Sequence, residues 1–134
     1  MEPLPWSGQR SERNLMRLLI ADNQAKVRYA LRVLLEKEPD IDVAGEASST
    51  ESLQKQISAC SPDVLIVDWL LLDNHSFERL QDLRAIAPNM KIIILSSKPE
   101  QRETIMHAGA DAFISKIDPP DRLMAAISKA QEQM

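Results

Sequence analysis

Five short apolar runs, spaced about 25 residues apart, constrain the fold of this chain more than any other feature. They are Leu18–Ala21, Ile41–Val43, Val64–Val67, Ile92–Leu95 and Ala112–Ile114. Strands at this rhythm are typical of consecutive βα units. The third and fourth runs are continuously apolar, as expected of central strands in a parallel sheet covered on both faces. The second run alternates apolar and polar residues, which favours an edge strand.

Helical patterns fill the intervals between these runs. Residues 27–35 carry an apolar stripe at the spacing of one helix face, and the fourth helix shows a much thinner stripe. Several residues are expected to mark helix ends. Ser48 and Glu51 have the spacing of a capping box at the start of the second helix. Pro99 is expected to begin the fourth helix and Gly109 to end it, and Asp118 is expected to cap the last helix. The order is therefore (βα)5.

Right-handed crossovers between such units produce an open, doubly wound parallel sheet of five strands. The length of 134 residues suits one domain. A closed barrel of eight units needs roughly 250 residues and is excluded. We expect residues 1–15 to form a flexible tail, because they mix Pro, Ser, Gly and charged residues without periodicity, and residues 16–134 to form the domain.

Charge and residue counts exclude several classes of function. A net charge of −4 argues against binding of nucleic acid or acidic membranes through general electrostatic attraction. Cys60 is the only cysteine, so no disulfide or CxxC redox pair can form within the chain. Three glycines are too few for a phosphate-cradling glycine-rich loop. No apolar run approaches the roughly 20 residues of a membrane span, and we expect a cytoplasmic protein.

Polar side chains follow four of the five apolar runs, at the carboxyl end of each expected strand. They are Asp22 and Asn23, then Asp68, then Ser96 and Ser97, and finally Ser115 and Lys116. In an open parallel sheet this edge carries the functional crevice. Carboxylate and amide oxygens suit a hard cation such as Mg²⁺, whereas a lysine ammonium and a serine hydroxyl suit the oxygens of a phosphoryl group. A carboxylate can also act as a nucleophile and hold an acyl phosphate.

The segments that carry these residues resemble the receiver domain of two-component response regulators, the CheY-like fold. The matching segments are LLIADN at 18–23, PDVLIVDW at 62–69, IIILSS at 92–97 and GADAFISK at 109–116. The segment LLEKEPDIDVAGEA and the ending KIDPP are most similar to the NarL/LuxR-type subgroup, in which a DNA-binding domain commonly follows the receiver. The resemblance implies the flavodoxin-like strand order 2-1-3-4-5, which CheY itself exemplifies.

The resemblance also implies a role for each matching residue. Asp68 takes the place of the phosphoacceptor aspartate. Asp22 and Asp68 would bind Mg²⁺ with the backbone carbonyl of Leu70. The phosphoryl-contacting and switch positions are taken by Ser96, Ser97, Lys116 and Phe113.

Two departures from the family pattern bear on the metal. Asn23 stands at the second acidic position, so it offers an amide oxygen without a charge, and Mg²⁺ binding is expected to be weakened. Leu72 and Ser76 replace the usual proline and glycine after Asp68, in a loop that is unusually apolar at residues 70–72.

Three functions compete on this basis. The leading hypothesis is a non-enzymatic phosphorelay switch that accepts a phosphoryl group on Asp68 from a sensor histidine kinase or phosphotransfer protein. It would then alter dimerisation through the fourth helix, fifth strand and fifth helix, or binding of an output partner, with DNA contacted only through a further C-terminal domain. The alternative is a degenerate receiver that binds proteins independently of phosphorylation, which Asn23 favours. An unrelated flavodoxin-like enzyme or FMN carrier is the weakest hypothesis, because the chain has only five aromatic residues and no Ser/Thr/Gly-rich phosphate loop after the first strand.

Overall fold

A computed structural model of the chain describes residues 15–134, with the side chains of Asp73 and Asn74 excepted. The expected tail, residues 1–15, lies almost entirely outside the described residues. The five strands are β1 (Met16–Ala21), β2 (Ile41–Ala47), β3 (Val64–Asp68), β4 (Lys91–Ser96) and β5 (Ala112–Ser115). The α-helices are α2 (Ala25–Leu35), α3 (Thr50–Cys60), α4 (Ser76–Ile86), α5 (Arg102–His107) and α6 (Pro120–Glu132), and the 3-10 helices are η1 (Trp69–His75) and η2 (Pro99–Gln101).

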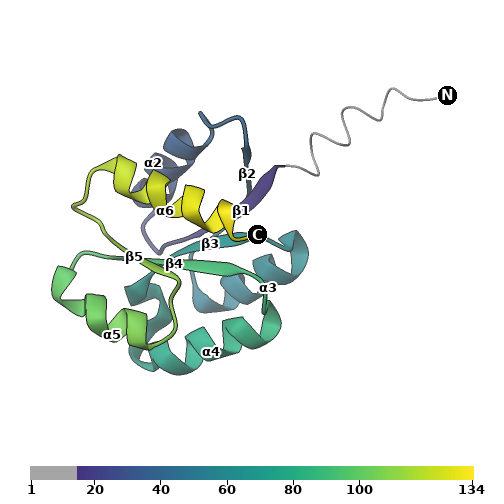
Figure 1. Ribbon diagram of the computed structural model, residues 1–134. Coiled ribbons are helices and arrows are strands. Elements are labelled where there is room, and N and C mark those ends of the chain that lie inside the picture. Colours follow the sequence, from purple (N-terminus) through teal and green to yellow (C-terminus); the bar gives the residue numbers. More distant parts are fainter. Residues whose placement is uncertain (1–14) are drawn as a thin grey trace.

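The strands form one parallel sheet in the order β2-β1-β3-β4-β5, which confirms the expected topology. Helices α2 and α6 cover one face, and α3, α4 and α5 cover the other (Figure 1). The central strand β3 is buried along its whole length, whereas the edge strand β2 is half-buried. This difference explains why the third apolar run is continuous and the second alternates.

Each face of the sheet has its own apolar core. Alternate residues of a strand point to opposite faces, so neighbouring β1 residues enter different cores: Leu19 packs with α3, α4 and α5, whereas Leu18 and Ile20 pack with α2 and α6. Each helix contributes at least one buried leucine or isoleucine to these cores, such as Leu53 and Ile57 of α3. Fully burying one such side chain stabilises the fold by about 1.5–3 kcal/mol.

Three local expectations were wrong or incomplete. The capping box of α3 is formed by Ser49 and Ser52, one residue later than expected: the Ser52 backbone N–H donates to Ser49 Oγ at 3.1 Å. Asp118 does not cap α6, because its carboxylate accepts the Ser115 backbone N–H at 3.0 Å instead. The fourth expected helix is divided into η2, which begins at Pro99, and the short α5.

Gly109 ends this helical segment as expected, with a φ of 108° that strains any side chain with a Cβ. Helix α5 buries only Ile105 among its own residues, in agreement with its thin apolar stripe. Among residues 15–134, no helix is long and apolar enough to cross a membrane.

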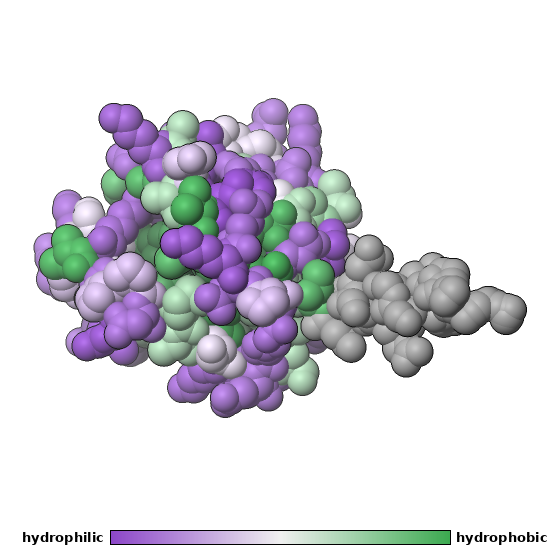
Figure 2. All heavy atoms as spheres, turned by 90° about the horizontal axis from the view of Figure 1, so that it is seen from above, coloured by the Kyte–Doolittle hydropathy of each residue, from purple (hydrophilic) through white to green (hydrophobic). Residues whose placement is uncertain are grey.

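The side of the molecule formed by α2 and α6 is hollowed by a cavity of about 450 Å³. Its lining is mostly apolar, with Val27 and Leu31 on α2 and Leu123 on α6, and it includes Ser115 and Lys116 at the end of β5. Figure 2 looks onto this side and shows hydrophobic side chains exposed among hydrophilic ones. Apolar surface therefore reaches the edge of the sheet that carries the polar strand ends.

Candidate functional site

Three charged side chains from three strand ends meet at the carboxyl edge of the sheet. Asp22 follows β1, Asp68 is the last residue of β3, and Lys116 follows β5. The Lys116 ammonium lies 2.8 Å from Asp22 Oδ2 and 3.1 Å from Asp68 Oδ1. Both aspartates are buried, with 0% and 2% of their surface exposed. The sequence prediction that these three residues converge agrees with this geometry.

Burial of two carboxylates beside one ammonium determines the electrostatics of this trio. Desolvation raises the pKa of Asp68 above its ordinary value, the hydrogen bond and charge of Lys116 oppose the rise, and the nearby Asp22 carboxylate adds to it. Burial by itself would lower the pKa of Lys116, but its bonds to Asp22 and Asp68 outweigh this effect and raise it. The ammonium therefore stays charged and holds both carboxylates in place.

The backbone around Asp22 is held by the edge strand and the first helix. Asp22 N–H donates to the Ala47 carbonyl of β2 at 3.0 Å, and Asp22 Oδ1 accepts the Gln24 N–H at 2.9 Å. Arg28 Nη1 donates to the Asp22 carbonyl at 2.7 Å, while Arg28 Nε pairs with Glu46 of β2 at 3.1 Å. The support from Arg28 was missed in the sequence, because no motif links a helical arginine to a carbonyl six residues earlier.

Ser96 is buried at the end of β4, the strand that lies between β3, which ends in Asp68, and β5, which is followed by Lys116. Its hydroxyl donates to Gln101 Oε1 at 2.6 Å and accepts the Lys98 N–H at 3.1 Å. Its carbonyl accepts the Lys116 N–H at 2.8 Å, which connects the ends of β4 and β5. Gln101 was also missed, because no sequence pattern indicates a glutamine at this distance.

The remaining predicted residues are placed less uniformly. Asn23, Ser97 and Leu70 are exposed, and Leu70 has 69% of its surface in solvent. A backbone hydrogen bond from Leu70 stabilises the ionised form of Asp68 and opposes the rise of its pKa. Phe113 is buried in β5, and the Arg102 guanidinium carbon lies 5.8 Å from its ring centroid. The apolar loop is the 3-10 helix η1, which buries Leu71 and Leu72 and exposes Leu70.

The oxygen donors at this edge suit a hard divalent cation. Asp22 and Asp68 supply two buried carboxylates against a single ammonium, so the trio has an excess negative charge. The Asn23 amide oxygen and the Leu70 carbonyl would complete the set without adding charge. Within the described residues there is no cluster of three or more His, Cys, Asp or Glu side chains that could hold a metal ion.

Comparison with known proteins identifies the family. Residues 18–128 match the family model of the response regulator receiver domain. The chain is 30% identical to the chemotaxis protein CheY of Thermotoga maritima over 118 residues, which cover 87% of this chain and 98% of CheY. It is 28% identical to the response regulator protein VraR of Staphylococcus saprophyticus, over 85% of this chain and 56% of VraR. It is 27% identical to the nitrate/nitrite response regulator protein NarL of Escherichia coli, over 84% of this chain and 53% of NarL.

The chain therefore spans about half the length of VraR and NarL. The isolated receiver domain of RcsB from Salmonella enterica superposes with a TM-score of 0.79 at 22% identity, over 89% of this chain and 90% of that one, and shows the shared fold. The family match covers most of the chain and includes the ends of all five strands. The chain belongs to the response regulator receiver domain family.

Proposed function

We propose that this receiver accepts a phosphoryl group on Asp68 from a histidine kinase or phosphotransfer protein in the cytoplasm. The single observation that supports this most is the ammonium of Lys116, bound to the two buried carboxylates at 2.8 and 3.1 Å. An Asp68 oxygen would attack the phosphorus of a phosphohistidine, the P–N bond would break, and its electron pair would stay on the imidazole. The product is an acyl phosphate on Asp68.

Each neighbouring group has a part in this proposal. Lys116 already contacts Asp68 and would stabilise the oxygens of the phosphoryl group as charge develops on them. The Ser96 hydroxyl would donate a hydrogen bond to a phosphoryl oxygen. Receiver domains generally bind Mg²⁺ at the phosphorylation site; here Asp22, Asp68, the Asn23 amide and the Leu70 carbonyl would hold it, where it supplies positive charge beside the transferring group.

The readout surface in this proposal consists of α5, β5 and α6. Helix α5 has few buried side chains of its own, and Met106 has 37% of its surface exposed. Phe113 of β5 connects this surface to the core. A shift of α5 would alter self-association or the binding of an output partner. VraR and NarL are about twice as long as the segment that this chain matches. We therefore propose that any contact with DNA would be made through a further domain.

A second candidate function is a receiver that binds proteins without phosphorylation. Asn23 supports it, since loss of one of about three anionic groups weakens Mg²⁺ binding. In this case the fold and its surfaces are kept and the switch is not used.

The test is incubation with Mg²⁺ and acetyl phosphate followed by prompt intact-mass measurement, with Asp68→Asn as the control. We expect the mass of one phosphoryl group on the parent and none on the control. Asn23→Asp is expected to bind Mg²⁺ about tenfold more tightly, because it adds a charge to the metal site. The exposed Asn89→Asp, in the loop before β4, is its matched control.

The outcomes separate the two functions. Labelling of Asn23→Asp but not of the parent would support the phosphorylation-independent receiver. Labelling of neither protein would overturn the assignment of Asp68 as phosphoacceptor.

A further inference from the structure

The hydroxyl of Ser96 has a partner that competes with its proposed role. It donates its only proton to Gln101 Oε1 at 2.6 Å, and it accepts the Lys98 N–H at 3.1 Å. A serine hydroxyl has one proton and two lone pairs, so it can donate to one acceptor at a time. As long as it donates to Gln101, it cannot donate to a group on Asp68.

We propose that Gln101 is a positioning residue that holds Ser96 in the unphosphorylated arrangement and thereby sets the equilibrium of the switch. This inference rests on the proposed phosphorylation of Asp68. To contact a phosphoryl oxygen, Ser96 must give up its bond to Gln101. The Gln101 bond favours the state in which Ser96 cannot contact a phosphoryl group, and it reduces the population of the state that can. The apparent affinity of the site for a phosphoryl group or its mimic is therefore lowered.

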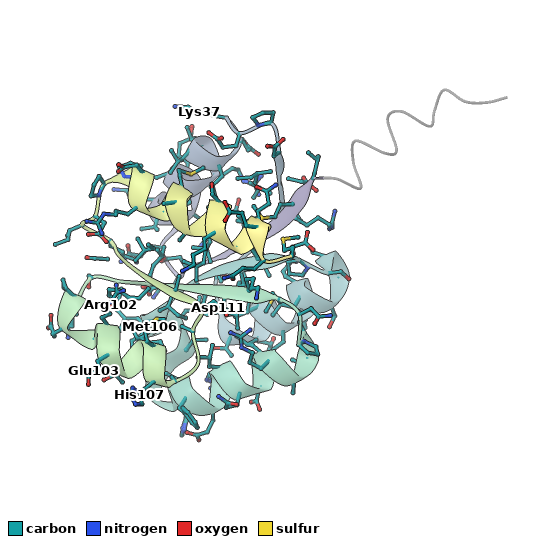
Figure 3. The ribbon with its side chains drawn as sticks, in the orientation of Figure 1. Lys37, Arg102, Glu103, Met106, His107 and Asp111 are labelled. Carbon is teal, nitrogen blue, oxygen red and sulfur yellow. The ribbon has the colours of Figure 1, made fainter. Side chains whose placement is uncertain are left out.

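The position of Gln101 connects this bond to the proposed readout surface. Gln101 is the last residue of η2, and α5 begins at the next residue, Arg102. Its backbone N–H closes the η2 turn by donating to the Lys98 carbonyl at 3.0 Å, and its side-chain oxygen accepts the Ser96 hydroxyl, so the side chain ties η2 to the end of β4. Arg102, labelled in Figure 3, lies over the ring of Phe113 on β5. Release of the Gln101 side chain therefore loosens the start of α5 directly beside the Arg102–Phe113 contact.

The experiment measures binding of fluoroberyllate, a phosphoryl mimic, in the presence of millimolar Mg²⁺, with Trp69 fluorescence as the signal. We expect Gln101→Met to raise the affinity for fluoroberyllate about fivefold, the factor that one modest hydrogen bond contributes to an equilibrium. Gln81→Met is the matched control, because Gln81 contacts the Ala108 carbonyl at the far end of α5. It is expected to leave the affinity unchanged.

A double-mutant cycle separates positioning from a general structural role. In the Ser96→Ala background the hydroxyl that donates to Gln101 Oε1 is gone. Gln101→Met is then expected to have no further effect on the affinity for fluoroberyllate. A second readout needs no ligand: hydrogen exchange of the first-turn amides of α5 is expected to accelerate in Gln101→Met and in Ser96→Ala alike.

The outcomes are distinct. Equal affinity of the parent and Gln101→Met, or the same change with and without the Ser96 hydroxyl, would overturn the positioning role and leave the proposed function intact. Unchanged hydrogen exchange would overturn the connection to α5. If the parent binds no fluoroberyllate, the proposed phosphorylation fails, and this inference fails with it.

Discussion

The inner and outer parts of the strand-end site differ in what holds them. The inner trio of Asp22, Asp68 and Lys116 is joined by two direct ion pairs and has buried carboxylates. The outer rim, formed by Asn23, Leu70 and Ser97, is exposed. The ammonium of the inner trio cannot be lost alone, because a buried carboxylate without its cation costs several kcal/mol. A rim residue can change with little effect on folding, so the departure from the family pattern at Asn23 occurs where it is tolerated, whereas the departure at Leu72 lies at a fully buried position.

The largest effect should come from breaking the inner trio. Lys116→Met leaves two buried carboxylates without their cation, and we expect the free energy of unfolding to fall by about 3 kcal/mol at neutral pH. The loss should shrink as the pH falls and the carboxylates become protonated. Urea unfolding at several pH values measures it, with the exposed Lys37→Met as the control (Figure 3). Equal stability of Lys116→Met and the parent would show that the trio is not held by this ammonium.

A smaller effect of opposite sign is expected at Asp68. Its pKa is raised in the folded protein, so its contribution to stability is present at acidic pH and is lost as the pH rises through the folded-state pKa. Asp68→Asn should therefore raise the free energy of unfolding at neutral pH by on the order of 1 kcal/mol, and this gain should shrink toward acidic pH.

Denaturant melts across this pH range test the sign, with the exposed Asp82→Asn of α4 as the matched variant. A loss of stability in Asp68→Asn at neutral pH would mean that attraction to Lys116 outweighs burial and repulsion from Asp22.

The smallest effect is expected at the rim. Leu70 has 69% of its surface exposed, and the groups it offers to the site are backbone atoms. Leu70→Ser should change the free energy of unfolding by no more than about 0.5 kcal/mol. It should also leave Mg²⁺ affinity unchanged in a fluorescence titration. Leu72→Ala, at a fully buried position of the same η1 segment, should cost about 3 kcal/mol. Similar losses of unfolding free energy in Leu70→Ser and Leu72→Ala would contradict the view that the exposed rim tolerates changes that buried positions do not.

The chain pattern was sufficient to predict the convergence of the inner trio. Parallel strands end at one edge, so residues after strands meet there regardless of the details of the helices. The strand order itself came from the family resemblance and not from the pattern. The boundaries were less accurate: β2 extends to Ala47, whereas its apolar run ends at Val43. An edge strand needs less apolar sequence, because its ladder of backbone hydrogen bonds does not depend on side-chain type.

Capping was the least predictable local feature. Ser48 and Glu51 have the spacing of a capping box, yet Ser49 and Ser52 form it. Adjacent serines differ little in intrinsic preference, so the register of the β2–α3 connection selects between them. Likewise, Asp118 precedes a proline at a helix start, but its carboxylate bonds the end of β5. Only in the second case does the competing partner come from a strand end.

By itself the sequence determined the alternation of strands and helices and the residue types at the strand ends, because periodicity and strand-end position are local properties of the chain. Only the tertiary structure decided which of those residues are paired, buried or left in solvent. Asp22 and Asn23 are adjacent in sequence, yet one is fully buried against Lys116 and the other is exposed. The bond from Ser96 to Gln101 depends in the same way on how η2 folds back on β4. Such contacts depend on the directions of side chains from separate elements, which no local pattern encodes.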